Sequence, residues 1–406
     1  MKILVLNCGS SSAKFQFIET DAERIERNED RLLAKGQVEK IGTAEAIVSC
    51  VSGERQRRDI IEILDHHAAI QKILASLEEM EVVKTAAEIE AIGHRVVHGG
   101  EFRSSQLFTD PILKEIESAT ALAPLHNPHN LKGYFVCREL FLDIPQVAVF
   151  DTAFHQTMPP RAFLYALPYH LYKRNHIRRY GFHGTSHRYV AYRFRQITGR
   201  SREDVNLITC HLGNGCSITA IQHGHSVDTS MGFTPLEGLV MGTRSGDLDP
   251  AILLHLMAKE EMTMHEVSSL LNRHSGLFGL SGESNDMREL LGSARRGHER
   301  AQLAIEVFCY RLRKYIGGYL VVLGRVDALI FTGGIGENAP RVRQLACEYL
   351  SNSGLELDPE RNEKAVGIEA EISTLRSPGR IYVIPTNEEL LIARDTYRTI
   401  LGIPHP

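Results

Sequence analysis

The chain has 406 residues, more than one hydrophobic core usually organises, so its length predicts two domains. Hydrophobic residues make up 43% and charged residues 24%, which is the balance of a soluble globular protein and excludes a disordered chain. The formal net charge is −4, from 46 basic and 50 acidic residues, so no excess of positive charge is available to bind nucleic acid. A small anionic ligand would need a few well-placed basic groups.

The cysteine pattern and the apolar runs indicate the compartment. The seven cysteines are scattered and include no Cys-x-x-Cys pair, which favours neither a disulfide framework nor a zinc site. The first apolar run, Ile3 to Leu6, is too short for the core of a signal peptide, and no stretch is long enough to span a bilayer. We expect a reduced, cytoplasmic protein without a membrane partner.

In the first half of the chain, apolar periodicity predicts strands and helices in alternation. Residues 20–60 are polar with weak strand patterning, and residues 155–182 are expected to form a long ordered loop before a helix that starts near His187. Strands are predicted at 2–6, 13–17, 91–97 and 146–150, and helices at 61–80, 111–122 and 131–141.

The second half begins with a hairpin pattern at 206–221 and ends with a strand at 381–384 and a terminal helix. Asn338 is expected to cap a helix that Ala339 and Pro340 open. Further helices are predicted near 250–258, 264–272 and 299–323, and a further strand at 326–331.

The hairpin at 206–221 repeats the pattern of residues 4–17. The two align at an offset of 204 positions, about half the chain, which places Gly213 against Gly9. Two unrelated hairpins would also explain so weak a repeat. We favour a duplicated domain because of what the two loops carry.

Three loops of glycine and small residues, 7–14, 211–217 and 332–338, each follow an apolar strand. Such loops let backbone N–H groups converge on phosphate. None is a Walker A motif, and Ile218 stands where a dinucleotide fingerprint would need a third glycine. Each alone is an ordinary turn, whereas three together favour nucleotide binding.

Isolated ionisable groups occur in other parts of the chain, several of them flanked by glycines. Arg95 and Arg244 are each flanked by glycines, where a guanidinium suits a carboxylate or a phosphoryl group, although a structural ion pair is as good an explanation. Asp151 directly follows a strand, as catalytic carboxylates and ordinary turn residues both do. His183 is interpreted as a donor to a phosphoryl group. The histidine pairs at ligand spacing, His94/His98, His126/His129 and His183/His187, are attributed to chance among 19 histidines.

Six segments in these regions resemble signatures of acetate kinases. They occur in the order known from that family and span nearly the whole chain. The segments are Asn7-Cys-Gly-Ser-Ser-Ser-Ala-Lys14, Asp151-Thr-Ala-Phe-His-Gln-Thr-Met-Pro159, Arg179-Tyr-Gly-Phe-His-Gly-Thr-Ser-His187, Met241-Gly-Thr-Arg-Ser-Gly-Asp-Leu-Asp-Pro250, Phe331-Thr-Gly-Gly-Ile-Gly-Glu-Asn338 and Thr386-Asn-Glu-Glu-Leu390.

The resemblance implies an α/β fold of two duplicated actin/ribonuclease H-like domains with an interdomain nucleotide cleft. Residues 1–151 plus 386–406 would form the N-terminal domain, with the acetate and metal side. Residues 152–385 would form the C-terminal domain, which would bind nucleotide and carry the dimer interface of a homodimer.

The resemblance also implies a role for particular residues. Asp151, Arg95, His183 and Arg244 would be catalytic, and Arg95 would also bind the acetate carboxylate. Asn7 and Glu388 would hold Mg²⁺ or Mn²⁺. The methyl pocket would consist of Val97, Leu125, Phe182 and Pro235. The ATP or ADP contacts would be Lys14, His211, Leu212, Gly213, Asn214, Gly215, Asp286, Met287, Arg288, Gly333, Gly334, Ile335, Gly336 and Glu337.

One segment, 281–288, departs from the family pattern, because Glu283 and Asn285 stand where smaller residues are expected.

The expected reaction is a reversible, Mg²⁺-dependent in-line transfer of the γ-phosphoryl group of ATP to acetate, with Asp151 as an organiser rather than a general base. The alternatives are a propionate or butyrate kinase, a non-catalytic nucleotide-binding regulator on the same fold, and a phosphohydrolase.

Overall fold

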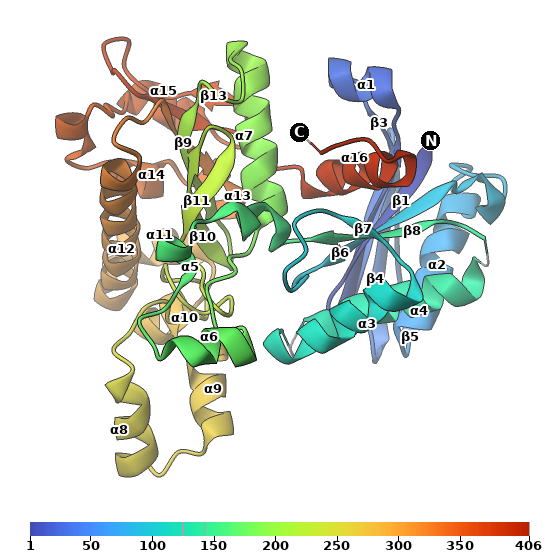
Figure 1. Cartoon of the computed structure of the whole chain (residues 1–406), viewed down its shortest axis with the longest axis horizontal. Helices are drawn as coiled ribbons and strands as arrows, with labels where there is room; N and C mark the ends of the chain where they lie inside the picture. The colour runs from blue at the N-terminus through green and yellow to red at the C-terminus, as the bar shows by residue number, and fades with distance from the viewer. Residues whose placement is uncertain (124–125, 142, 406) are drawn as a thin grey trace. The chain divides into compact units, whose positions relative to one another are not determined.

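The computed structural model describes residues 1–123, 126–141 and 143–405 and divides into two compact units (Figure 1). Unit 1 comprises Met1–Gln156 and Asn387–Pro406, and unit 2 comprises Thr157–Thr386. Each unit is built on one sheet, and each is described by itself. The assignment of acetate and metal to the N-terminal domain and of nucleotide to the C-terminal domain remains a prediction.

Unit 1 contains an eight-stranded sheet in the order β5-β4-β3-β2-β1-β6-β8-β7. Strands β1, β6 and β8 are parallel neighbours, and the remaining pairs are antiparallel. The strands are β1 (Lys2–Cys8), β2 (Ser12–Glu19), β3 (Arg31–Glu39), β4 (Thr43–Ser52), β5 (Arg55–Ile63), β6 (Ala91–Val96), β7 (Gln106–Leu107) and β8 (Gln146–Phe150). The helices are α1 (Ala22–Arg27), α2 (His66–Glu79), α3 (Asp110–Ser118), α4 (Asn127–Leu140) and α16 (Glu388–Leu401), with short 3₁₀ turns at Ala86–Glu88, Ala119–Leu122 and Ala153–Thr157.

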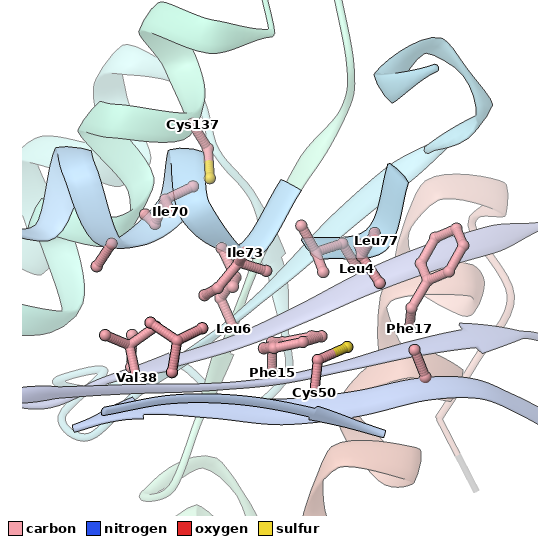
Figure 2. Packing of buried hydrophobic residues seen from close by; sticks show 14 of the residues in the cluster. Leu4, Leu6, Phe15, Phe17, Val38, Cys50, Ile70, Ile73, Leu77 and Cys137 are labelled. Atoms are coloured by element: carbon pink, nitrogen blue, oxygen red, sulfur yellow. The ribbon is translucent and has the colours of Figure 1, made fainter. Parts of the chain in front are cut away.

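Alternation along the strands of unit 1 divides the core between the two faces of the sheet. Leu4 and Leu6 point toward α2, where Ile73 and Leu77 complete the large cluster that Figure 2 shows. Ile3 and the other residues on its side of the sheet pack instead under α16, which lies on the opposite face (Figure 1). Because α16 comes from the C-terminal end of the chain, unit 1 is formed by two separate segments.

Unit 2 contains a six-stranded sheet in the order β11-β10-β9-β12-β14-β13. Its strands are β9 (Asn206–Leu212), β10 (Cys216–Gln222), β11 (His225–Thr229), β12 (Ala328–Thr332), β13 (Ala370–Glu371) and β14 (Arg380–Val383). Its helices are α5 (Pro160–Phe163), α6 (Tyr169–Asn175), α7 (Gly184–Thr198), α8 (Ala251–Lys259), α9 (Met264–Arg273), α10 (Gly276–Ser281), α11 (Met287–Arg295), α12 (Glu299–Leu323), α13 (Gly333–Asn338), α14 (Pro340–Ala346) and α15 (Pro359–Lys364), with a 3₁₀ turn at Leu350–Ser353. Helices α7 and α12 flank this sheet (Figure 1).

The two sheets share one topology. The order β3-β2-β1-β6-β8 in unit 1 recurs as β11-β10-β9-β12-β14 in unit 2, with antiparallel hairpins followed by parallel strands in both. This repeat confirms the predicted duplication. The match is not position for position, however: Cys8 pairs with Ala13, whereas Leu212 pairs with Cys216, so the second hairpin loop is one residue shorter.

Several predicted elements differ from the observed ones. The helix expected from 61 begins at His66, because residues 61–63 complete β5 and Asp65 caps α2 by accepting from Ala68 N–H at 2.8 Å. Residues 155–182, expected to be a loop, contain α5 and α6, which are too short to show a helical period. Asn338 ends α13 instead of capping α14, and its side-chain amide donates to the Gly334 carbonyl.

All seven cysteines are buried as free thiols. Burial raises the pKa of the Cys8 and Cys216 thiols to about 12, so both are held in the neutral, unreactive form. Among the helices in the described part of the chain, none combines the length and the hydropathy that a membrane crossing requires.

Candidate active site

The parallel strands of unit 1 end side by side, and polar residues lie at their carboxyl ends. Alternation along β1 places Asn7 on the same face as Ile3 and Val5, which pack under α16. Arg95 near the end of β6 and Asp151 just after β8 belong to this face too, since α16 covers both strands. In open α/β sheets this edge is where ligands bind.

Arg95 and Asp151 form a forked ion pair. Nε and Nη2 of Arg95 donate to the two carboxylate oxygens of Asp151 at 2.9 and 2.6 Å, and Asp151 is only 1% exposed. Burial lowers the pKa of the Arg95 guanidinium, but the charges of Asp151 and Glu388 outweigh it and raise the pKa above its usual value. Arg95 is therefore a fixed cation whose orientation Asp151 sets.

The first turn of α16 brings two more carboxylates to this edge. Asn387 caps the helix by accepting from Leu390 N–H at 3.1 Å, and Glu388 then lies 3.8 Å from Nη2 of Arg95. Burial, and next the charge of Glu388, raise the pKa of Glu389. Glu389 is a site residue that the sequence analysis missed.

The oxygen donors Asn7 and Glu388 fit the hard ligands that Mg²⁺ takes. Across the described residues there is no group of three or more His, Cys, Asp or Glu side chains that could hold a metal alone.

Asparagines of α4 hold the loop that follows β6. The side-chain oxygen of Asn130 accepts from Val97 N–H at 3.0 Å, and its amide donates to the Cys8 carbonyl at 2.7 Å, which ties this loop to the end of β1. Of the four predicted pocket residues, Val97 is in unit 1, Phe182 and Pro235 are in unit 2, and Leu125 lies outside the described residues.

In unit 2, His183 directly precedes α7 with a left-handed backbone (φ 56°). Its Nδ1 lies 2.9 Å from the Ser217 hydroxyl oxygen, and its ring stacks on His211 with 4.3 Å between the ring centroids. His211 is the last residue but one of β9 and pairs with Thr332, the last residue of β12. The two predicted histidines therefore come together at the carboxyl edge of the second sheet.

Arg244 reaches the same point from its own loop. A Cβ on Gly215 would lie 3.4 Å from Nε2 of His183 and 3.5 Å from Nη1 of Arg244, so both donors border the space that this glycine leaves open. Burial lowers the pKa of the Arg244 guanidinium, and among the described residues no carboxylate pairs with it. A cation without a counter-charge beside a histidine suits an anionic ligand.

Helix α13 follows β12 directly, although a loop was expected at 332–338, and its first residue needs to be glycine because it approaches β9. Gly333 has φ +76°, and a Cβ there would lie 2.8 Å from the Leu212 carbonyl oxygen. The Glu337 carboxylate accepts from the N–H groups of Gly333 and Thr386 at 2.8 and 3.0 Å. Glu337 therefore ties the first turn of α13 to Thr386, the last residue of unit 2.

These loops border a pocket of about 660 Å³ within unit 2. Asp286 caps α11 and makes a forked pair with the exposed Arg288, and Asn285 donates to the Asn214 side chain at 2.9 Å. Asn285, which departs from the family pattern, therefore joins its own side of the pocket to the side that Asn214 forms. The lining residues are Gly213, Asn214, Asn285, Asp286, Met287, Arg288, Leu291, Gly334, Ile335, Asn338 and Ala339.

The structure thus gathers the predicted residues into two sets. In unit 1 it brings Arg95, Asp151 and Glu388 together, and in unit 2 it brings His183 and Arg244 together. Sequence reasoning missed Ser217, Glu389, Leu291, Asn338 and Ala339. Asn338 ends the glycine-rich segment 332–338, Ala339 follows it, and Glu389 adjoins Glu388, so adjacency was a usable signal for these three.

Comparison with known proteins decides the family. The model of the acetokinase family matches residues 2–394. The chain belongs to the acetokinase family. A relative named acetate kinase from Solibacter usitatus is 54% identical over 416 aligned positions, with all of both chains covered.

Two solved structures share this fold over nearly their whole lengths. The acetate kinase of Porphyromonas gingivalis has a TM-score of 0.92 at 43% identity, covering 98% of this chain and 99% of that one. A propionate kinase from Francisella tularensis has a TM-score of 0.90 at 42% identity, covering 99% of this chain and 100% of that one. The fold of this acetokinase is therefore the duplicated actin/ribonuclease H-like fold.

Proposed function

We propose that this chain is an ATP:acetate phosphotransferase that forms acetyl phosphate and ADP reversibly. The acetokinase match over residues 2–394 carries the proposal. Acetate is ionised near neutral pH, so it needs no base to attack the γ-phosphorus. The reaction then depends on alignment and charge stabilisation, by in-line transfer without a phosphoenzyme.

On the acceptor side, Arg95 would bind the acetate carboxylate. Its Nε and Nη2 are held by Asp151, and among the described residues Nη1 donates no hydrogen bond, which supports a role for Nη1 in binding a second anion. Val97, Leu125, Phe182 and Pro235 would enclose the methyl group. Asp151 would orient Arg95 and would not take a proton.

On the phosphoryl side, His183 and Arg244 would contact the group in transfer. Both donors border the space beside Gly215, and the adenosine of ATP would occupy the pocket lined by Ile335, Asp286 and Arg288. Lys14, Leu212 and Gly336 would complete the predicted nucleotide contacts together with His211 to Gly215 and Gly333 to Glu337. Asn7 and Glu388 would hold Mg²⁺, which neutralises charge between the β- and γ-phosphates when bound.

The test of this function is ADP release with and without acetate, followed by hydroxylamine trapping of acetyl phosphate. We expect ADP release only when acetate is present, and none after EDTA until Mg²⁺ is restored. ATP binding without acetate-dependent ADP formation would favour the regulator, and equal release without acetate would favour a hydrolase.

A propionate kinase is the second candidate, because one similar solved structure, at 42% identity, is that of a propionate kinase. Propionate has one more methylene than acetate, and apolar pockets separate such pairs by only about 10–200-fold. Comparison of kcat/KM for acetate, propionate and butyrate decides between them, with the largest value expected for acetate.

We also propose a cytoplasmic homodimer that associates through unit 2. Helix α12 exposes Leu303, Tyr310, Val321 and Val322, and Val321 is 83% exposed, which supports an interface on this helix. The seven free thiols suit a reducing compartment. Sedimentation velocity should give the mass of two chains, and a single-chain mass at micromolar concentration would contradict the dimer.

A further inference from the structure

A chain of hydrogen bonds runs from the core of unit 2 to His183. The Thr209 hydroxyl lies 2.7 Å from Nδ1 of His187, and Nε2 of His187 lies 2.7 Å from the Ser217 hydroxyl. The same Ser217 oxygen lies 2.9 Å from Nδ1 of His183. Thr209, His187 and Ser217 are fully buried, so this chain is isolated from water.

The Ser217 hydroxyl has one hydrogen and lies between two imidazole nitrogens, so it can donate to only one of them. If it donates to one ring nitrogen, it accepts from the other. When Thr209 donates to His187, Nε2–H of His187 donates to Ser217, and Ser217 in turn donates to Nδ1 of His183. In that arrangement the neutral His183 ring must carry its proton on Nε2.

The direction of this proton decides what His183 can do. Nε2 is the His183 nitrogen that borders the space beside Gly215, which the Arg244 guanidinium also borders. A neutral ring with Nε2–H is a donor to an anion there, whereas a ring protonated on Nδ1 would direct a lone pair at that anion. Without the hydrogen bond from Ser217, the His183 ring could adopt either tautomer and would be less firmly held.

We propose that Ser217 is a positioning residue for phosphoryl transfer, which fixes the His183 ring with Nε2–H directed at the phosphoryl site. This inference rests on the proposed function for its kinetic consequence. Its structural part, the tautomer and the orientation of His183, holds for the free protein and is measured separately.

The experiment compares Ser217→Ala with Ser217→Thr, which keeps the hydroxyl, and with Ser230→Ala as the matched control. Ser230 is also a fully buried serine, but its hydroxyl accepts from the Ile218 N–H at 3.0 Å. In protein labelled with ¹⁵N-histidine, the ring signals of His183 are assigned by their loss in His183→Asn. We expect the Nε2–H tautomer in the parent and in Ser230→Ala, and mixed tautomers in Ser217→Ala.

Kinetics add a second readout. Ser217→Ala should lose about 10–100-fold in kcat, the usual effect of removing the partner that orients a functional histidine, with the KM values for ATP and acetate within about threefold. Ser217→Thr should restore most of the loss. If Ser217→Ala does not fold, Ser217→Cys replaces it, and its weaker hydrogen bond should cause a smaller shift in the same direction.

An Nδ1–H tautomer in the parent protein, or an unchanged tautomer and kcat in Ser217→Ala, would overturn the proposal. A uniform rise in KM with kcat unchanged would overturn it too, because that is the effect of weaker binding and not of a misdirected donor. If the parent protein shows no acetate-dependent ADP release, the proposed function fails while the tautomer measurement still decides the role of Ser217.

Discussion

The hydrogen bonds of Arg95 reconcile the two interpretations that the sequence left open for this residue, a structural ion pair and a ligand-binding group. Nε and Nη2 are both bound to Asp151, as in a structural ion pair. Among the described residues Nη1 makes no hydrogen bond, and it belongs to a side chain at the carboxyl edge of the sheet. The two interpretations are therefore compatible, because the ion pair fixes the guanidinium and leaves one nitrogen for a substrate.

Asp151 variants test this orienting role. Asp151→Asn keeps an acceptor oxygen for Arg95, whereas Asp151→Ala leaves the guanidinium without its partner. We expect Asp151→Asn to keep most of its kcat/KM for acetate and Asp151→Ala to lose about 100-fold, the effect of misplacing a group that aligns the reactants. Steady-state kinetics with varied acetate measure both. Equal losses in the two variants would mean that the negative charge itself takes part.

Arg244 variants test stabilisation of the transition state. Arginines that contact a phosphoryl group in transfer contribute about 10³–10⁵-fold in other nucleotide enzymes, so Arg244→Ala should lose a turnover factor of this size. Arg244→Lys should restore little, because an ammonium lacks the planar fork. Calorimetric titration with ADP should give a Kd within a few-fold of the parent.

Arg288→Ala is the matched control for Arg244, because Arg288 is an exposed arginine that lines the pocket proposed for the nucleotide. Its loss should raise the KM for ATP and leave kcat nearly unchanged. Near-normal turnover in Arg244→Ala would remove that residue from the mechanism.

At this scale the sequence predicted residues that stand out and missed those that do not. Arg95, Arg244 and His183 are conspicuous as charged or titratable groups among glycines. Ser217 lies in the stretch Cys216-Ser-Ile-Thr219, which alternates as any buried strand does. Nothing local shows that its hydroxyl meets two imidazoles from another element, since that contact depends on packing.

At the scale of elements, α12 has the bounds that its sequence predicted, yet its composition is unusual for a helix. Gly317 and Gly318 interrupt its interior, where each glycine costs about 1 kcal/mol relative to alanine. A Cβ at either position would meet no atom within 4 Å in this chain. Packing within the chain therefore does not require them.

Gly317→Ala should stabilise the fold by about 0.5–1 kcal/mol, because the helical backbone accepts alanine and the side chain has room. Urea unfolding measures the free energy of unfolding. Gly333→Ala is the matched control: its backbone has a positive φ and its Cβ would approach Leu212, so we expect destabilisation and weaker ADP binding. A loss of stability in Gly317→Ala, with dissociation of the dimer, would instead indicate a second copy against this face.

Elements with strong periodicity were predicted well, and those without it were not. Helix α12 and strand β8 have the predicted bounds, because a long helix and a fully buried strand have clear patterns. Strands β3 to β5 appeared weak because they alternate buried and exposed residues irregularly at the outer end of their sheet. Their position in the sheet is set by successive pairing, of β3 with β2, of β4 with β3 and of β5 with β4, which no local pattern contains.

At the scale of the molecule, duplication supplies two similar scaffolds to which different chemistry is attached. Both sheets carry the candidate site residues at the carboxyl ends of their parallel strands. In unit 1 these include the Arg95–Asp151 pair, and in unit 2 they include glycine-rich segments and histidines. The half-chain repeat predicted the duplication of the scaffold. It did not predict the shorter hairpin loop of unit 2, because a one-residue difference in a turn is invisible without strand pairing.

The order of the segments along the chain also has a consequence for synthesis. Unit 2 is continuous in sequence, whereas unit 1 receives α16, with the buried Ile392 and Ala393, only from the last segment of the chain. On the ribosome, the strands of unit 1 emerge before unit 2 but keep one apolar face bare until α16 has been synthesised. At about 5–20 residues per second this delay is on the order of tens of seconds, during which the nascent N-terminal half is a natural client for chaperones.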